Sequence, residues 1–179
     1  LAFYFFLSSW QAKKNSNKYI FAVLAGLSTA GMALIWGGYA YIFLTIAPSF
    51  LLAFLLGKVD KTKLYVYTLW ITAAFIPMHF YSSRYGFRDF FTSIDSGSTV
   101  VVLFIVVIHF IIFGSKLKTF FSGEKLSKIP SQIISLIISL IILVIVSSVL
   151  FGISFIPAQF QIIYNNLVRP ATSRLIQTV

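Results

Sequence analysis

The side chains with the strongest potential for chemistry lie in one polar segment, residues 81–95. This segment carries two arginines, two aspartates and five aromatic residues between long apolar stretches. Arginine beside aromatic residues at a membrane surface suits a phosphate-bearing lipid, because the planar guanidinium group donates paired hydrogen bonds to phosphate oxygens. The alternative is that Arg84 and Arg88 pair with Asp89 and Asp95 and only order the loop. The sequence supports both interpretations equally.

Other candidates for chemistry are few. His109 lies inside an apolar stretch, where an ionisable group indicates either a functional site or a hydrogen bond to a neighbouring helix. The second, packing role is favoured, because neutral imidazole is only moderately polar. The sequence has no phosphate-cradling loop, no HExxH zinc motif and no Gly-x-Ser-x-Gly nucleophile motif. These absences argue against the nucleophilic and hydrolytic classes of soluble enzyme.

The composition indicates an integral membrane protein. Of the 179 residues, 59% are hydrophobic and 10% are charged, whereas soluble domains carry about 25% charged residues. The net charge of +10 would suggest a nucleic acid partner in a soluble protein. The mean hydropathy of +0.93 excludes that interpretation. The absence of cysteine excludes a disulfide framework and thiolate metal sites.

Long stretches without charge predict the helices that position these residues. A helix that crosses the hydrocarbon layer needs about 20 mostly apolar residues. Residues 19–57 carry no charge, and one helix of that length would be far too long at about 1.5 Å per residue. We therefore expect a turn at residues 36–39, where two glycines lie between Trp and Tyr. The prediction is an all-α polytopic bundle with a partial span at 1–10 and complete spans near 19–35, 40–57, 64–81, 98–114 and 131–152.

The loops between these spans separate the two kinds of basic residue. All ten lysines lie in residues 11–18, 58–63 and 115–128, and all four arginines lie in residues 82–97 and 153–179. Successive spans place alternate loops on the same side of a membrane. The positive-inside rule then predicts cytoplasmic lysine loops and extracytoplasmic arginine loops, with residues 153–179 beginning an external loop. The lysines are interpreted as determinants of topology that meet anionic lipid.

Small residues recur at helical spacing within the spans. Ala22, Gly26 and Ala30 form a small-xxx-small stripe that lets two helices approach closely. Ser131, Ser135 and Ser139 form a similar stripe in the last span. Both stripes are interpreted as helix-packing surfaces.

The order of these motifs resembles one protein family. The resemblance rests on Trp36-Gly37-Gly38-Tyr39, on the loop with Tyr85-Gly86-Phe87 and Ser93-Ile94-Asp95, and on Thr178-Val179 at the end. The chain resembles the central membrane region of the catalytic subunit of oligosaccharyltransferase, of the archaeal type. These GT-C-like glycosyltransferases move a glycan from a dolichol- or polyprenol-linked phosphate donor to Asn in Asn-x-Ser/Thr. The chain would correspond to helices four through nine of thirteen, within one transmembrane domain.

The resemblance also implies roles for individual residues. Thr178 would contact the acceptor Asn amide, and Trp36, Gly37, Gly38 and Tyr39 would border the cleft through which the donor enters. Arg84 and Arg88 become candidate partners of the donor phosphate or of anionic headgroups. Asp95 and Ser96 stand where the family has Glu-His, so no role is carried over to Asp95.

The resemblance places the catalytic groups outside this chain. The family needs a divalent cation, Mn or Mg, held by acidic residues that precede Leu1 or follow Val179. No catalytic or metal-ligating residue is therefore predicted here, and the family's soluble C-terminal domain would also lie outside. The implied partners are a lipid-linked oligosaccharide, an acceptor polypeptide and membrane lipid, with no nucleic acid.

Two other hypotheses remain at this point. The chain is also compatible with another polyprenyl-phosphate-dependent glycosyltransferase of similar architecture. It is further compatible with a non-catalytic membrane subunit or a fragment of a transporter. All three hypotheses treat the sequence as part of a larger membrane protein, because Leu1 lies inside an apolar run.

Overall fold

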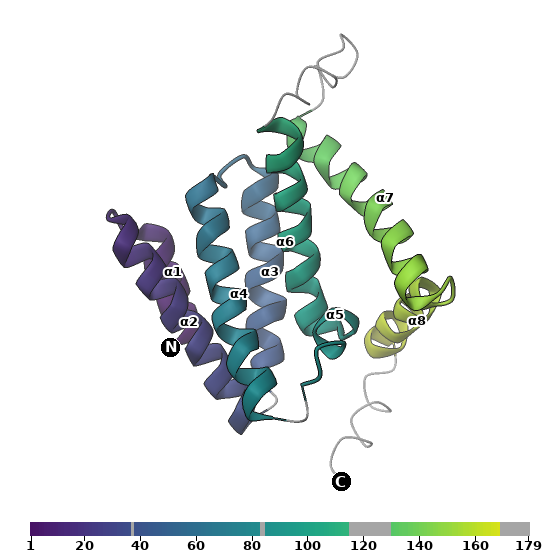
Figure 1. Cartoon of the computed structure of the whole chain (residues 1–179), viewed down its shortest axis with the longest axis horizontal. Helices are drawn as coiled ribbons and strands as arrows, with labels where there is room; N and C mark the ends of the chain where they lie inside the picture. The colour runs from purple at the N-terminus through teal and green to yellow at the C-terminus, as the bar shows by residue number, and fades with distance from the viewer. Residues whose placement is uncertain (37, 83–84, 115–129, 169–179) are drawn as a thin grey trace. The chain divides into compact units, whose positions relative to one another are not determined.

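The computed structural model describes residues 1–36, 38–82, 85–114 and 130–168 (Figure 1). This part of the chain is helical and contains no strand. Its helices are α1 (Ala2–Gln11), α2 (Asn15–Ile35), α3 (Tyr39–Leu55), α4 (Lys61–Tyr81), α5 (Asp89–Thr92), α6 (Ile94–Phe113), α7 (Ser131–Phe151) and α8 (Phe155–Val168).

A helix occupies each apolar stretch for which a full or partial span is predicted. Three of them, α2, α6 and α7, are long and apolar enough to cross a membrane. These three helices support a membrane-embedded protein. Helix α3 is apolar but has only 17 residues, and α4 begins with two lysines in its first turn. How many helices cross the membrane stays a prediction.

Two short helices lie outside the predicted spans. Helix α5 is a single turn within residues 82–97, which we call the arginine loop. Helix α8 occupies most of the described part of residues 153–179. Gly152, with φ of +89°, separates α7 from α8, a backbone conformation that glycine adopts without a steric cost. The region expected to begin an external loop therefore begins with a helix rather than with irregular chain.

The chain divides into two compact units, Leu1–Ile137 and Ile138–Val179. The first unit contains α1 to α6 and the first two turns of α7. In the second unit, the rings of Phe151 and Phe155 stack across the turn at Gly152, with centroids 4.8 Å apart. The prediction of a single transmembrane domain stays a prediction.

The most extensive helix pairing in the first unit joins α2 to α4. Every buried residue of α2 is small: Ala22, Ala25, Gly26, Thr29, Ala30 and Ala33. A Cβ atom added to Gly26 would lie only 2.6 Å from the Cβ of Ala73 in α4. The two backbones thus approach so closely that only glycine fits at this position. This contact confirms the packing role predicted for the stripe that contains Gly26.

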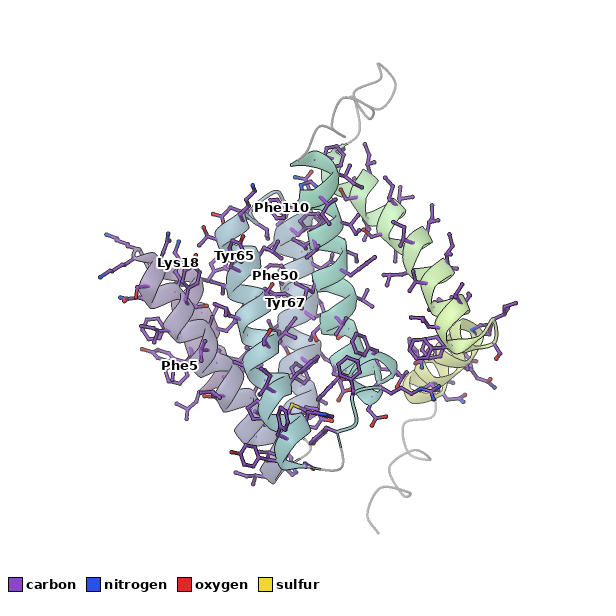
Figure 2. All side chains as sticks on the ribbon, viewed as in Figure 1. Phe5, Lys18, Phe50, Tyr65, Tyr67 and Phe110 are labelled. Atoms are coloured by element: carbon purple, nitrogen blue, oxygen red, sulfur yellow. The ribbon has the colours of Figure 1, made fainter. Side chains whose placement is uncertain are left out.

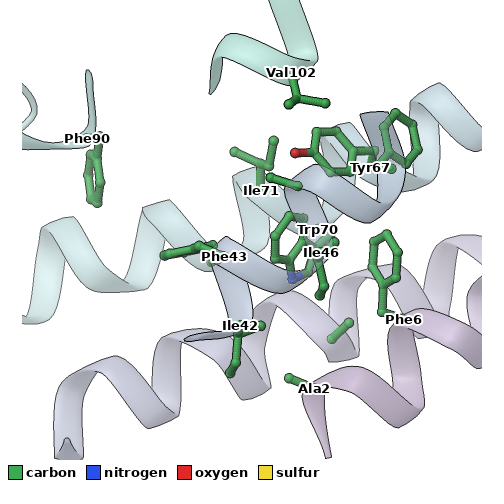
Figure 3. Packing of buried hydrophobic residues seen from close by; sticks show 14 of the residues in the cluster. Ala2, Phe6, Ile42, Phe43, Ile46, Tyr67, Trp70, Ile71, Phe90 and Val102 are labelled. Atoms are coloured by element: carbon green, nitrogen blue, oxygen red, sulfur yellow. The ribbon is translucent and has the colours of Figure 1, made fainter. Parts of the chain in front are cut away.

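Trp70 is the central side chain of the core that forms on this pair. It is fully buried, and its Nε1 donates a hydrogen bond of 3.2 Å to Oγ1 of Thr29. Its ring meets those of Phe6 in α1 and Phe43 in α3 edge to face at 5.4 and 5.5 Å (Figure 3). One residue of α4 therefore contacts three other helices.

A second aromatic contact continues the core toward α6. Phe50 of α3 stacks on Tyr67 of α4 with ring centroids 4.1 Å apart (Figure 2). The Tyr67 hydroxyl donates to the carbonyl oxygen of Thr99 in α6 at 3.2 Å. Because Tyr67 is fully buried, this hydrogen bond avoids the unfavourable free energy of burying a hydroxyl without a partner.

The link between α3 and α4 is short and is held by local hydrogen bonds. Gly57 adopts a φ of +69°, and the Lys58 amide donates to the Ala53 carbonyl at 2.9 Å, a pattern typical of a glycine that ends a helix. The Asp60 carboxylate then accepts from the Lys63 amide at 2.8 Å and caps the start of α4. The ammonium of Lys63 lies 4.5 Å from the ring centre of Trp10 in α1. The α1–α2 and α3–α4 links therefore lie at one end of the bundle, which we call the lysine end.

The α2–α4 contact yields a direct prediction. We expect Gly26→Ala to lower the free energy of unfolding by about 1–3 kcal/mol, because the added methyl group would overlap Ala73. Gly31→Ala is the matched control, because a Cβ atom there meets nothing within 4 Å in the described residues. Thermal denaturation of both variants in detergent, followed by size-exclusion chromatography, measures the difference. Equal stability of the two variants would contradict the close approach.

Candidate functional site

The end of the bundle opposite the lysine end gathers polar and aromatic residues from five helices. Here α2 and α4 end, α3 and α6 begin, and α5 lies beside them (Figure 1). We call its central residues the tyrosine cluster: Tyr39, His79, Tyr85, Phe90 and Asp95. The cluster contains residues from both segments on which the family resemblance rests.

Tyr85 connects the arginine loop to the bundle. Its side chain is 7% exposed, and its hydroxyl donates a hydrogen bond of 2.9 Å to the carbonyl oxygen of Ala33. Ala33 lies in the last turn of α2, where carbonyls lack partners within the helix. Nδ1 of His79, near the end of α4, donates to the Tyr85 carbonyl oxygen at 3.0 Å. Tyr85 therefore holds the loop against the ends of α2 and α4.

Tyr39 brings the Trp-Gly-Gly-Tyr segment to the same place. Its ring meets that of Tyr85 edge to face at 5.5 Å. Its hydroxyl interacts with the Tyr85 hydroxyl and with the carboxylate of Asp95. Two segments almost fifty residues apart in sequence thus share a polar contact at the entry to α3 and α6.

Stacked aromatic rings pack against the tyrosine cluster through Phe90. Phe90 of α5 is 3% exposed and stacks on Phe75 of α4 with centroids 4.2 Å apart. Its other neighbours are the rings of Tyr85 and His79, at 6.5 and 6.4 Å. This stack packs the single turn of α5 against α4, next to the ring of Tyr85.

The two aspartates of the loop accept hydrogen bonds from nearby backbone amides. Oδ2 of Asp89 accepts from Gly86 at 2.9 Å, which closes the turn before α5. Asp95 lies in the first turn of α6, where a negative charge is favourable, and its Oδ1 accepts from Ser96 at 2.8 Å. The Asp89 carboxylate therefore orders the loop locally, whereas the Asp95 carboxylate accepts within the first turn of α6 and also faces Tyr39.

Trp36 and Gly38 lie at the edge of the cluster. Trp36 is 64% exposed, and its six-membered ring covers the Cα of Gly38, where a Cβ atom would collide with it. A large aromatic surface is thus presented at the end of α2, beside Tyr39. Such a residue is typical of the membrane interface.

The predicted site residues differ in how the structure places them. Trp36, Gly38, Tyr39 and Asp95 lie together at this end of the bundle. Arg88 precedes α5 at the same end, with an exposed side chain. Gly37, Arg84 and Thr178 lie outside the described residues.

Two residues of the cluster were not singled out as site residues by the sequence analysis. Tyr85 is part of the Tyr85-Gly86-Phe87 motif, and no motif described above includes His79. Their importance comes from contacts with Ala33 and with each other, which join positions far apart in sequence. Local sequence patterns carry no signal for such contacts.

His109 has the packing role that the sequence analysis favoured. The Ser135 hydroxyl donates to the Ser131 carbonyl at 2.8 Å. It must therefore accept the hydrogen bond from Nδ1 of His109, also at 2.8 Å. The His109 ring further meets Phe54 edge to face at 5.0 Å. His109 thus links α6 to the first turns of α7 and to α3.

The described residues contain no group of three His, Asp or Glu side chains that could hold a metal ion. None of them is therefore assigned to the divalent cation that the family resemblance implies. The polar side-chain groups of the tyrosine cluster are two hydroxyls, one imidazole and one carboxylate.

Comparisons of the chain with known protein families, with curated proteins and with solved structures found no match.

The contribution of the hydrogen bond between Tyr85 and Ala33 to stability can be tested by removing the Tyr85 hydroxyl group. We expect Tyr85→Phe to lower the free energy of unfolding by about 1–3 kcal/mol, because the buried Ala33 carbonyl would lose its partner. Tyr81→Phe is the control, because the Tyr81 side chain is 81% exposed. Thermal unfolding in detergent measures both variants. A Tyr85→Phe protein as stable as the control would show that this bond does not hold the loop.

Proposed function

We propose that this chain is part of the membrane domain of an oligosaccharyltransferase that glycosylates Asn in Asn-x-Ser/Thr. One observation carries the proposal beyond the sequence motifs. The Trp-Gly-Gly-Tyr segment and the Tyr-Gly-Phe loop, which carry the resemblance, meet through Tyr39 and Tyr85 at one end of the bundle. Elements that together border a donor site are expected to adjoin in this way.

The proposal includes a GT-C-like bundle with five complete spans, namely α2, α3, α4, α6 and α7. The contact between Lys63 and Trp10 supports it, because it places two lysine-bearing links at the same end. The tyrosine cluster lies at the opposite end, with the exposed Arg88. With the lysine end cytoplasmic, the cluster faces the extracytoplasmic side, where lipid-linked donors are used.

In this proposal the described residues bind and position rather than catalyse. Trp36 offers an exposed aromatic surface to the polyprenyl chain of the donor, and Arg88 offers a planar cation to its phosphates. The tyrosine cluster holds the loop that carries Arg88. The acidic ligands and the cation, Mn or Mg, which would activate the acceptor and stabilise the leaving phosphate, belong to parts of the protein outside this chain.

An in vitro glycosylation assay tests the proposal. The full-length protein is expected to transfer glycan from a lipid-linked donor to an Asn-x-Thr peptide when Mn or Mg is present, and to lose activity with a chelator. The flanking sequence is expected to contain an Asp-x-Asp-like motif before Leu1 and Glu two residues after Val179. Transfer to a sugar or lipid instead would favour another polyprenyl-phosphate-dependent glycosyltransferase. Movement of a solute without any transfer would favour a transporter.

The arginine loop gives a more specific prediction. In the full-length protein, we expect Arg88→Ala and Arg84→Ala each to raise the KM for the lipid-linked donor about tenfold, because a charge-assisted hydrogen bond contributes about 1.5–3 kcal/mol. The KM for the peptide should change little. Asp89→Asn is the control, because it weakens the turn at Gly86 without removing an arginine. Unchanged donor kinetics in both arginine variants would favour the purely structural role of the loop.

A further inference from the structure

A cavity of about 240 Å³ lies at the lysine end, far along the bundle from the tyrosine cluster. It is formed between the first turns of α4 and the last turns of α6. The lining residues are Lys61, Leu64, Tyr65, Val107, Phe110 and Ile111. Tyr65 and Phe110 are labelled near this end in Figure 2.

The wall of the cavity is mostly apolar, and the cavity opens at the outer surface of the bundle. Leu64 and Phe110 are partly buried and pack against the core. Tyr65 and Ile111 are 59% and 53% exposed. In a membrane, an open apolar recess between two helices is in contact with lipid chains. Its volume accommodates a segment of hydrocarbon chain.

The mouth of the cavity is positively charged. Residues 58–63 contain three lysines and one aspartate, a net charge of +2 from +3 and −1. The Asp60 carboxylate caps α4, and the Lys63 ammonium donates to the Lys58 carbonyl at 2.6 Å beside the Trp10 ring. By contrast, the Lys61 ammonium has no hydrogen-bond or ion-pair partner among the described residues. Lys61 also lines the cavity, so its ammonium is available to a ligand there.

We propose that this cavity binds an anionic phospholipid of the leaflet at the lysine end. The phosphate lies at the Lys61 ammonium, with the Tyr65 hydroxyl as a second donor, and an acyl chain lies along Val107 and Ile111. An ammonium at the mouth of an apolar recess complements a ligand that has a negative head and a hydrocarbon tail. The proposal does not depend on the proposed function, because it uses none of the residues of the tyrosine cluster.

Native mass spectrometry of the delipidated protein tests this site. With added phosphatidylglycerol we expect one lipid to bind more tightly than the others, and phosphatidylcholine should not replace it. Lys61→Gln should weaken the binding of that lipid about fivefold, equivalent to about 1 kcal/mol for one lysine. Lys13→Gln is the control, because it removes the same charge from an exposed position in the α1–α2 link. Equal effects of the two variants would overturn the proposal.

A second variant tests the apolar part of the site while retaining the charge. Ile111→Trp should fill the recess and weaken phosphatidylglycerol binding about as much as Lys61→Gln does. Because Ile111 is about half exposed, the fold should tolerate the larger ring, and the thermal stability of the variant checks this. Inorganic phosphate should not compete with the lipid. Competition by phosphate, or normal lipid binding by Ile111→Trp, would show that only a free anion is recognised.

The lack of cysteine makes it possible to identify the occupant directly. In an Ile111→Cys variant of this chain, a benzophenone attached to the introduced thiol should crosslink to phosphatidylglycerol in nanodiscs. Crosslinking to a polypeptide instead would show that another helix covers the recess, and it would overturn the proposal. Glycosylation activity does not enter this measurement, so the failure of one proposal can be distinguished from the failure of the other.

Discussion

The close approach of α2 to α4 is the constraint on which the rest of the first unit depends. It exists because α2 buries only glycine, alanine and threonine against its neighbours. Apolar association gains little inside a lipid bilayer, so dispersion contacts and hydrogen bonds between helices must supply the stability. The Trp70 to Thr29 hydrogen bond forms at this contact, and the rings of Phe6 and Phe43 pack on Trp70. Larger residues on this face of α2 would separate the helices and remove these contacts together.

The same constraint determines the geometry of the tyrosine cluster. With α2 and α4 held together, the Ala33 carbonyl and the His79 ring lie at fixed positions at one end of the pair. Tyr85 fits between them, since its hydroxyl reaches Ala33 while its carbonyl accepts from His79. Tyr39 and Asp95 are then positioned by their contacts with Tyr85 and with each other. The candidate site is thus a consequence of helix packing rather than of loop sequence alone.

Features that repeat along the chain could be predicted from the sequence. The apolar stretches located α2, α3, α4, α6 and α7, and the small residues around Gly26 located the main helix contact. Helices α5 and α8 escaped prediction, because one is a single turn and the other follows α7 after only a short interruption at Gly152. In the candidate site, the motifs pointed to Tyr39 and Asp95. The roles of Tyr85 and His79 depend on tertiary contacts and could not be read from spacing.

The link between α3 and α4 also bears on how the protein enters a membrane. Its reversal is specified within a few residues, by Gly57 and by the Asp60 cap. A pair of helices joined in this way can form before any later part of the chain is synthesised. Helix α4 begins with Lys61 and Lys63 and is not among the three most apolar long helices. For the five-span arrangement, the unit that must partition favourably during biogenesis is therefore the α3–α4 hairpin, in which the apolar α3 offsets the weaker hydropathy of α4.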